Sequence, residues 1–111
     1  MLILFKNKYM ESIKIVTICG SMKFKNKMME VAEDLELKHG LVVIQCVYGN
    51  DNRKYTEVEL ELLGKLHYRK IDISDAIYVV NVDGYVGDSV KKEINYARSL
   101  GKTILSLEPL V

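Results

Sequence analysis

Three scarcities in this 111-residue sequence narrow the possible classes of protein. It contains one proline, no tryptophan and two cysteines, Cys19 and Cys46, which are too far apart for a CxxC motif. No apolar run approaches the roughly 20 residues that a membrane-spanning helix needs, and the N-terminal MLILF is too short for the core of a signal peptide. We therefore expect a cytoplasmic protein whose two cysteines are reduced and buried.

Excess charge and metal-binding motifs are missing as well. Sixteen Lys and Arg against fifteen Asp and Glu leave a net charge of +1, which gives no reason to expect nucleic acid or a membrane surface as a partner. His39 and His67 are not at ligand spacing, and no HExxH, Walker loop or GxGxxG is present. The predicted partner is a small molecule, with no metal and no cofactor.

What the chain does have is a regular alternation of apolar and amphipathic stretches. The apolar runs are typical of buried parallel strands and cover 14–19, 41–47, 76–82 and 102–107. The predicted helices lie between them, at about 22–39, 56–74 and 88–100. This order predicts an α/β fold, a flavodoxin-like or Rossmann-like three-layer sandwich with a small parallel sheet of order 2-1-3-4. We assign residues 13–111 to a single domain and 1–12 to an N-terminal extension.

Local signals mark the ends of the helices. Gly40 and Gly101 stand where a left-handed residue would end the first and third helices. Thr56 and Glu59 have the spacing of a capping box at the start of the second helix. Either Asp88 or Ser89 serves as N-cap of the third.

The third helix carries a carboxylate on its apolar face. At about 100° per residue, one arc holds Val90, Ile94, Ala97 and Leu100. Glu93 falls within this arc, and a carboxylate that faces a core must be paired, neutralised or used. We place it in the first turn, where the helix dipole favours an anion. Glu93 is thus a candidate nucleophile or general base; the alternative is a flank glutamate that reaches water or pairs with a lysine.

The second helix points a histidine in the same direction. Its inner face is formed by Leu60, Leu63, His67 and Ile71. An inward histidine is often a hydrogen-bonded core residue, and the alternative for His67 is a role beside Glu93.

Two glycine-bearing loops, 20–25 and 83–89, should meet at the switch point between the first and third strands, where ligands bind in such folds. Amides and a hydroxyl at a strand-to-helix turn suit a phosphate. Lys23 and Lys25 add charge there or are merely solvated, and Phe24 is either core or a platform for a base.

The polar loop 48–55 is a candidate lid. The candidate nucleotide-binding residues are Gly20, Ser21, Met22, Lys23, Phe24, Tyr48, Gly84, Tyr85, Gly87, Asp88 and Ser89.

Three segments, CGSMKF, SDAIYVVNV and GDSVKKEINYARSLGKTILSL, resemble the nucleoside 2-deoxyribosyltransferase-like superfamily. The resemblance covers about residues 14–109 and looks closest to a subgroup of small bacterial and phage proteins related to the nucleoside 5′-monophosphate N-glycosidases. It implies that Glu93 is a nucleophile that attacks the sugar C1′ and forms a glycosyl-enzyme intermediate. It also implies a homodimer or higher homo-oligomer.

This sequence departs from the family at two positions. His67 and Gly87 stand where characterised members have aspartates. The first departure leaves His67 to assist as an acid or to position the substrate. The expected function is hydrolysis or transfer at the N-glycosidic bond of a nucleoside 5′-monophosphate or nucleoside. The alternative is a non-catalytic nucleotide-binding protein, a sensor or sequestering protein of the same fold.

Overall fold

The computed structural model describes residues 12–50 and 52–110. The extension predicted for residues 1–12 therefore lies, apart from Ser12, outside the described residues. In chain order, the elements are β1 (Ile15–Gly20), α1 (Lys25–His39), β2 (Val42–Ile44), α2 (Glu57–Asp72), β3 (Ala76–Val80), α3 (Asp88–Ser99) and β4 (Thr103–Ser106). Short 3-10 turns, Met22–Phe24 and Val82–Gly84, precede α1 and α3.

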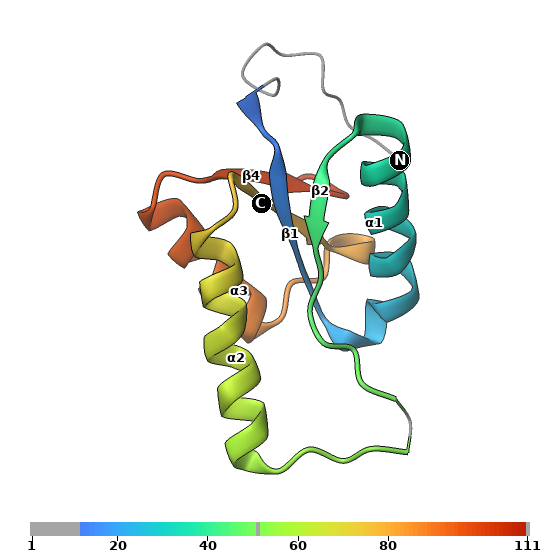
Figure 1. The fold of residues 1–111 in the computed structure, drawn as a ribbon, viewed down its shortest axis with the longest axis vertical. Helices are drawn as coiled ribbons and strands as arrows, with labels where there is room; N and C mark the ends of the chain where they lie inside the picture. Colours follow the sequence, from blue (N-terminus) through green and yellow to red (C-terminus); the bar gives the residue numbers. More distant parts are fainter. Residues whose placement is uncertain (1–11, 51, 111) are drawn as a thin grey trace.

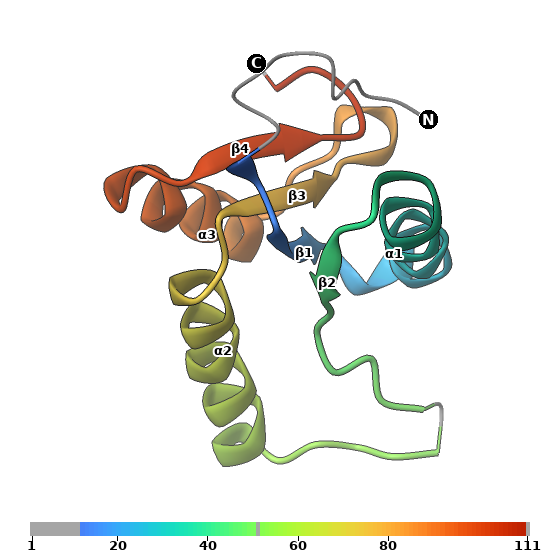
Figure 2. The ribbon, with the colours of Figure 1, turned by 45° about the horizontal axis from the view of Figure 1, so that its top comes forward.

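The described strands form one parallel sheet of order β2-β1-β3-β4. Helix α1 covers one face, whereas α2 and α3 cover the other (Figures 1 and 2). This is the three-layer α/β arrangement that the alternation of strands and helices predicted. Within the described ranges, we find no helix with both the length and the apolar character that crossing a bilayer requires.

The predicted helix ends are confirmed in most cases. Gly40 and Gly101 adopt left-handed φ angles of 66° and 72°. Thr56 and Glu59 form the capping box, with reciprocal bonds of 3.1 and 2.9 Å between side chain and backbone. The predicted N-cap of α3, Asp88 or Ser89, is wrong. Gly87 is the N-cap, and this helix begins without a side-chain capping hydrogen bond.

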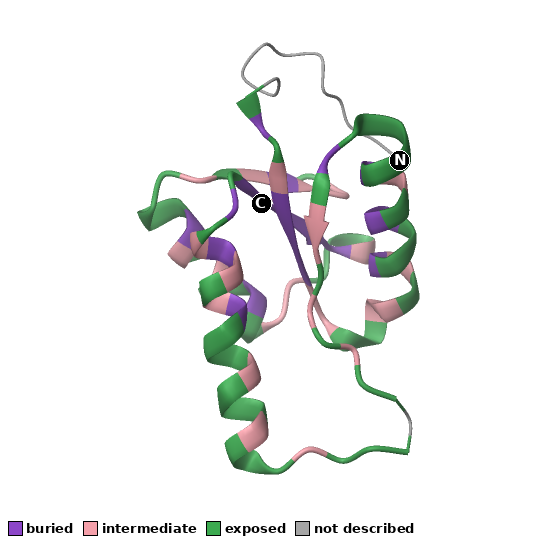
Figure 3. Cartoon of the chain, viewed as in Figure 1, coloured by how far each residue is buried: buried purple, intermediate pink, exposed green. Residues whose placement is uncertain are grey.

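One strand and two residues that we predicted to be buried are exposed in whole or in part, because of where they lie in the fold. Only three residues of the run 41–47 pair as β2, and Val42 is 58% exposed because β2 is an edge strand that pairs only with β1. Leu100 is exposed because it follows the last residue of α3. Leu60 is exposed because the N-terminal half of α2 extends beyond the sheet (Figure 3).

Alternate residues of the central strands build two separate cores. Toward α1, Val16, Ile18 and Tyr78 pack on the apolar stripe of that helix, which comprises Met28, Val31, Ala32 and Leu35. Toward α2 and α3, a smaller core comprises Cys19, Ile71, Ile77, Val79, Val90, Ile94 and Ala97. Because successive side chains of a strand point to opposite faces, Ile18 and Cys19 are neighbours in sequence but belong to different cores.

Candidate functional site

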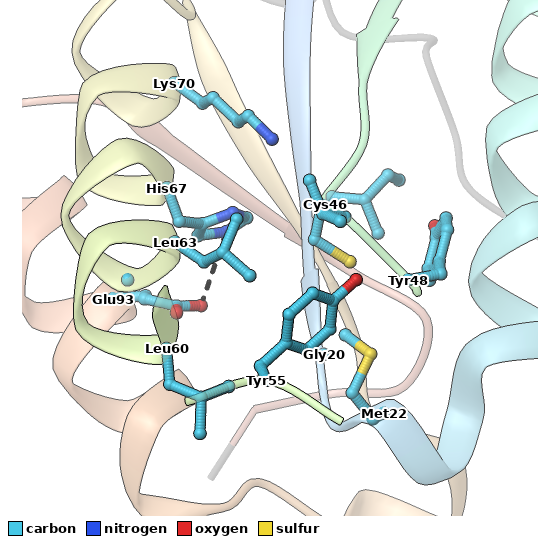
Figure 4. A pocket seen from close by; sticks show the side chains of 13 residues that line it. Gly20, Met22, Cys46, Tyr48, Tyr55, Leu60, Leu63, His67, Lys70 and Glu93 are labelled. Atoms are coloured by element: carbon cyan, nitrogen blue, oxygen red, sulfur yellow. Dashed lines mark ion pairs between the residues drawn. The ribbon is translucent and has the colours of Figure 1, made fainter. Parts of the chain in front are cut away.

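Three polar side chains, one each from β1, α2 and α3, meet between the sheet and the two helices. Cys19 lies near the end of β1, His67 on α2 and Glu93 on α3. The distances are 3.4 Å from Cys19 Sγ to His67 Nε2 and 3.6 Å from His67 Nε2 to Glu93 Oε1. The predicted meeting of His67 and Glu93 is thus confirmed (Figure 4). Cys19 was expected only as a buried, reduced cysteine, and its place in this cluster was not predicted.

The local structure explains why these polar groups point inward. Cys19 is on the α2–α3 side of the sheet by the alternation of β1. His67 lies one helical turn before Ile71, and both are buried on the same face of α2. Glu93 is one turn before the buried Ala97 on α3. Cys19 is 1% exposed, His67 8%, and the Glu93 side chain 16%.

Burial changes the acidity of Glu93. It raises the pKa of this carboxyl to about 7, while the contact with the Cys19 thiol acts in the opposite direction. Glu93 is the sixth residue of α3, and the first turn holds Asp88 instead. The prediction that the helix dipole stabilises the Glu93 anion is therefore wrong, because that effect falls off within the first turn.

The other two members of the cluster are also driven toward their neutral forms. Burial, followed by the charge of Lys70, lowers the pKa of His67 to about 4. Burial raises the pKa of the Cys19 thiol well above its usual value, and the Glu93 charge adds to this. At neutral pH, the contact of His67 with Glu93 is therefore a polar contact of a neutral imidazole and not an ion pair.

His67 and Glu93 form one wall of a pocket of about 360 Å³, whereas Cys19 lies behind them and is not among its lining residues. Tyr48 and Tyr55 come from the segment between β2 and α2, and Leu63 comes from α2 (Figure 4). Lys70 is the one cation among the described lining residues, and its Nζ donates to the Gln45 carbonyl oxygen at 2.8 Å. The lining residues are Ile18, Gly20, Met22, Cys46, Val47, Tyr48, Tyr55, Leu60, Leu63, Gly64, His67, Lys70 and Glu93.

The pocket contains some of the predicted site residues and adds others. Gly20, Met22, Tyr48, His67 and Glu93 line it. Sequence reasoning missed Lys70, although its helical spacing of three from His67 offered a signal. It also missed Cys46 as a lining residue, for which no spacing offered a signal, and it included Tyr55 only as part of the candidate lid 48–55. Cys46 was expected to be buried, but it is half-buried because β2 ends before it and the chain leaves the sheet.

The two glycine-bearing loops meet as predicted, but beside this pocket. The Phe24 and Tyr85 rings pack edge to face with centroids 5.9 Å apart, and Lys23 Nζ lies 3.3 Å from the Tyr85 centroid. Phe24 also packs against the α1-side core. The predicted nucleotide-binding residues that do not line the pocket are Ser21, Lys23, Phe24, Gly84, Tyr85, Gly87, Asp88 and Ser89.

Gly20 has a packing role of its own at the end of β1. A Cβ placed there would lie 2.8 Å from Met28 Sδ and 3.3 Å from the Val80 carbonyl oxygen. The residue thus lets the strand end pass closely over α1 and β3. Gly20, a candidate residue for phosphate binding, therefore also has a structural reason to be glycine, since it allows this close approach.

The fold defines the class of protein as Rossmann-like α/β with a parallel sheet of order 2-1-3-4. No protein-family model and no curated protein sequence matches the chain. Among solved structures, the chain is similar to that of a conserved protein from Enterococcus faecalis V583, with a TM-score of 0.59 and 11% sequence identity. The match covers 86% of this chain and 63% of that one, so this chain spans less than two thirds of the similar protein. Likeness at this identity shows the fold alone.

Proposed function

We propose that the protein breaks the N-glycosidic bond of a nucleoside 5′-monophosphate or nucleoside, by hydrolysis or transfer, with Glu93 as the nucleophile. One observation carries the proposal: a largely buried carboxylate, 3.6 Å from a histidine, faces a pocket of about 360 Å³. The pocket lies beyond the carboxyl end of β1, the edge where parallel α/β sheets bind ligands. Its volume is within the usual range for small-molecule sites.

In the proposed reaction, a Glu93 carboxylate oxygen forms a bond to the anomeric carbon of the sugar. The bond between that carbon and the base nitrogen breaks, and its electron pair leaves with the base, which takes up a proton from solvent. Water, or a second base, then attacks the same carbon and releases the Glu93 carboxylate. With the pKa of Glu93 at about 7, about half of the molecules have the nucleophilic, ionised form at neutral pH.

The pocket walls support a nucleotide as the ligand class. Tyr48 and Tyr55 offer aromatic surface for a base (Figure 4). Lys70 offers an ammonium group that suits a 5′-phosphate. In this proposal, His67 acts as a neutral hydrogen-bonding group that positions the sugar or the departing base, because its pKa of about 4 leaves little imidazolium at neutral pH.

The test is chromatography of a panel of ribo- and deoxyribonucleosides and their 5′-monophosphates after incubation with the protein. We expect free base from at least one substrate, and a loss of about a thousandfold or more in Glu93→Gln. Glu61→Gln is the matched control, since it makes the same change on the exposed surface of α2. Base release that survives in Glu93→Gln would rule out this nucleophile. A second free base that captures the sugar would identify transfer.

A second candidate, nucleotide binding without turnover, is favoured by the low pKa of His67. No imidazolium stands beside the carboxylate at neutral pH to protonate a departing base. This candidate expects a nucleotide to raise the melting temperature while no substrate of the panel releases base. Loss of that thermal shift in Lys70→Met, with Lys65→Met on the exposed face of α2 as control, would place the nucleotide in the pocket.

A further inference from the structure

We propose that Cys19, His67 and Glu93 form a binding site for a thiophilic divalent cation of the Zn²⁺ class. One sulfur, one imidazole nitrogen and one carboxylate oxygen lie within 4.8 Å of one another. They come from β1, α2 and α3, so the tertiary structure alone brings them together. The observations behind this site do not require the glycosidic reaction proposed above.

Two of the three distances within the cluster agree with tetrahedral coordination. With Zn–S bonds of about 2.3 Å and Zn–N and Zn–O bonds of about 2.0 to 2.2 Å, neighbouring ligand atoms lie about 3.3 to 3.6 Å apart. The Cys19 Sγ to His67 Nε2 distance is 3.4 Å, and the His67 Nε2 to Glu93 Oε1 distance is 3.6 Å. The third pair, Cys19 Sγ and the Glu93 carboxylate, lies within 4.8 Å, so an ion would bind on closure of that one distance.

The chemistry of the donors selects the class of ion. A thiolate excludes Mg²⁺ and Ca²⁺, which prefer oxygen ligands, while a combination of sulfur, imidazole and carboxylate suits Zn²⁺. Three protein ligands, with the fourth position facing a pocket, is the pattern of zinc sites that accept water or a substrate group. His67 and Glu93 line the pocket, so a fourth ligand would reach the ion from that side (Figure 4).

Burial of the cluster is compatible with the same site. In their neutral forms the thiol, imidazole and carboxyl contact one another, at 3.4 and 3.6 Å, and a cation is the other partner that would offset their burial. Only Lys70 lines the adjoining pocket as a cation among the described residues, and its Nζ already donates to the Gln45 carbonyl oxygen. A divalent ion would supply the positive charge that lets the thiol and the carboxyl ionise, with release of their protons to solvent.

Occupancy would have a consequence for the glycosidic reaction. The ion would hold the Glu93 oxygen that attacks the sugar, so metal binding and glycosyl transfer exclude each other. A metal-bound form would still accept a nucleotide phosphate or a water molecule at its fourth position.

The experiment measures binding with no nucleotide present. The chelator-treated, reduced protein is titrated with Co²⁺, a spectroscopic substitute for Zn²⁺, and then with Zn²⁺ by calorimetry. We expect one ion per chain, a near-ultraviolet band from sulfur-to-cobalt charge transfer, and visible bands of tetrahedral intensity. Zn²⁺ should displace Co²⁺ and raise the melting temperature.

Variants identify the ligands. We expect Cys19→Ser to abolish the charge-transfer band, and each of Cys19→Ser, His67→Gln and Glu93→Gln to weaken Zn²⁺ binding by at least about a hundredfold. His39→Gln, which changes the other histidine, should bind Zn²⁺ as the wild type does. Circular dichroism and a cooperative melt establish that each variant is folded.

Several results would overturn the site. These are a Co²⁺ spectrum of the wild type without the charge-transfer band, Zn²⁺ affinity that Cys19→Ser leaves unchanged, or an equal loss in His39→Gln. The wild-type spectrum decides the question even if a variant fails to fold. Because no substrate is used, a negative result here leaves the glycosidic reaction untouched, and an absence of base release leaves the metal site untouched.

Discussion

The two faces of the sheet are made from alternate residues of the same strands, yet they differ in polarity. On the α1 face, β1 contributes Val16 and Ile18, and the helix meets them with a continuous apolar stripe. On the α2–α3 face, β1 contributes Thr17 and Cys19, and the helices add His67 and Glu93. The first face is a conventional hydrophobic core, while the second places three ionisable groups in contact.

This difference indicates a division of roles within one small domain. Burial of apolar side chains at the α1 face stabilises the fold, at roughly 25 cal/mol per Å² of apolar surface. At the α2–α3 face, burial raises the pKa of Glu93 and lowers that of His67, so it favours the neutral form of each group and lowers stability wherever these groups are charged. Polar groups kept at such a cost are functional-site candidates.

The largest expected effect on stability is at the α1 face. Leu35 is 1% exposed within that core, so Leu35→Ala should lower the free energy of unfolding by about 2 to 5 kcal/mol through lost transfer energy and a residual cavity. The control is Leu37→Ala on the same helix, where the side chain is 79% exposed and the change should be small. Denaturant unfolding measures both variants. A loss below about 1 kcal/mol in Leu35→Ala would contradict the role of this face.

A change at the other face should have the opposite sign. The pKa of Glu93 is 4.5 in its ordinary state and about 7 when folded, so its contribution is most favourable below pH 4.5 and declines as the pH rises to 7. Glu93→Gln in chelator-treated protein should therefore be more stable than the wild type by about 1 to 3 kcal/mol at pH 8, and close to it at pH 4.

The measurement is urea unfolding of both proteins at several pH values between 4 and 8, with Glu61→Gln as the control for loss of a surface charge. A difference between Glu93→Gln and the wild type that does not grow across this range would show that burial does not hold the Glu93 proton.

A smaller effect is expected at the start of α2, the helix that presents His67. The Thr56 hydroxyl accepts a hydrogen bond from the Glu59 amide at 3.1 Å, so Thr56→Ala should cost about 1 kcal/mol. Thr56→Ser keeps the hydroxyl and should restore most of the loss. Thermal unfolding followed by circular dichroism checks both. Equal melting temperatures for the alanine and serine variants would argue that the cap adds nothing to the α2–α3 face.

Sequence patterns that act within a few residues were sufficient to predict much of the fold. Strand and helix order, the capping box at Thr56 and the left-handed ends at Gly40 and Gly101 all follow from such patterns. Helical periodicity also placed His67 and Glu93 on inward faces, and the strand order put them near one another. Their roles in a reaction remain predictions.

The length of the edge strand β2 and the position of Glu93 along α3 were predicted less well, since they depend on what packs beside a residue. The apolar run 41–47 has the composition of a buried strand, but its place at the edge of the sheet limits β2 to Val42–Ile44. Glu93 was assigned to the first turn of a helix whose start, at Asp88, places it in the second.

Residue spacing was enough to predict an α/β domain with a parallel sheet and an inward carboxylate and histidine, because amphipathic periodicity and turn residues encode those features locally. The tertiary structure adds Cys19 to this pair, since residues 48 and 26 positions apart meet only after three elements have packed. It also decided that Lys70, Cys46 and Tyr55 share a pocket with them, and that burial leaves Glu93 with a pKa of about 7. Contacts and desolvation between distant segments are properties of the packed chain and have no signature in its local spacing.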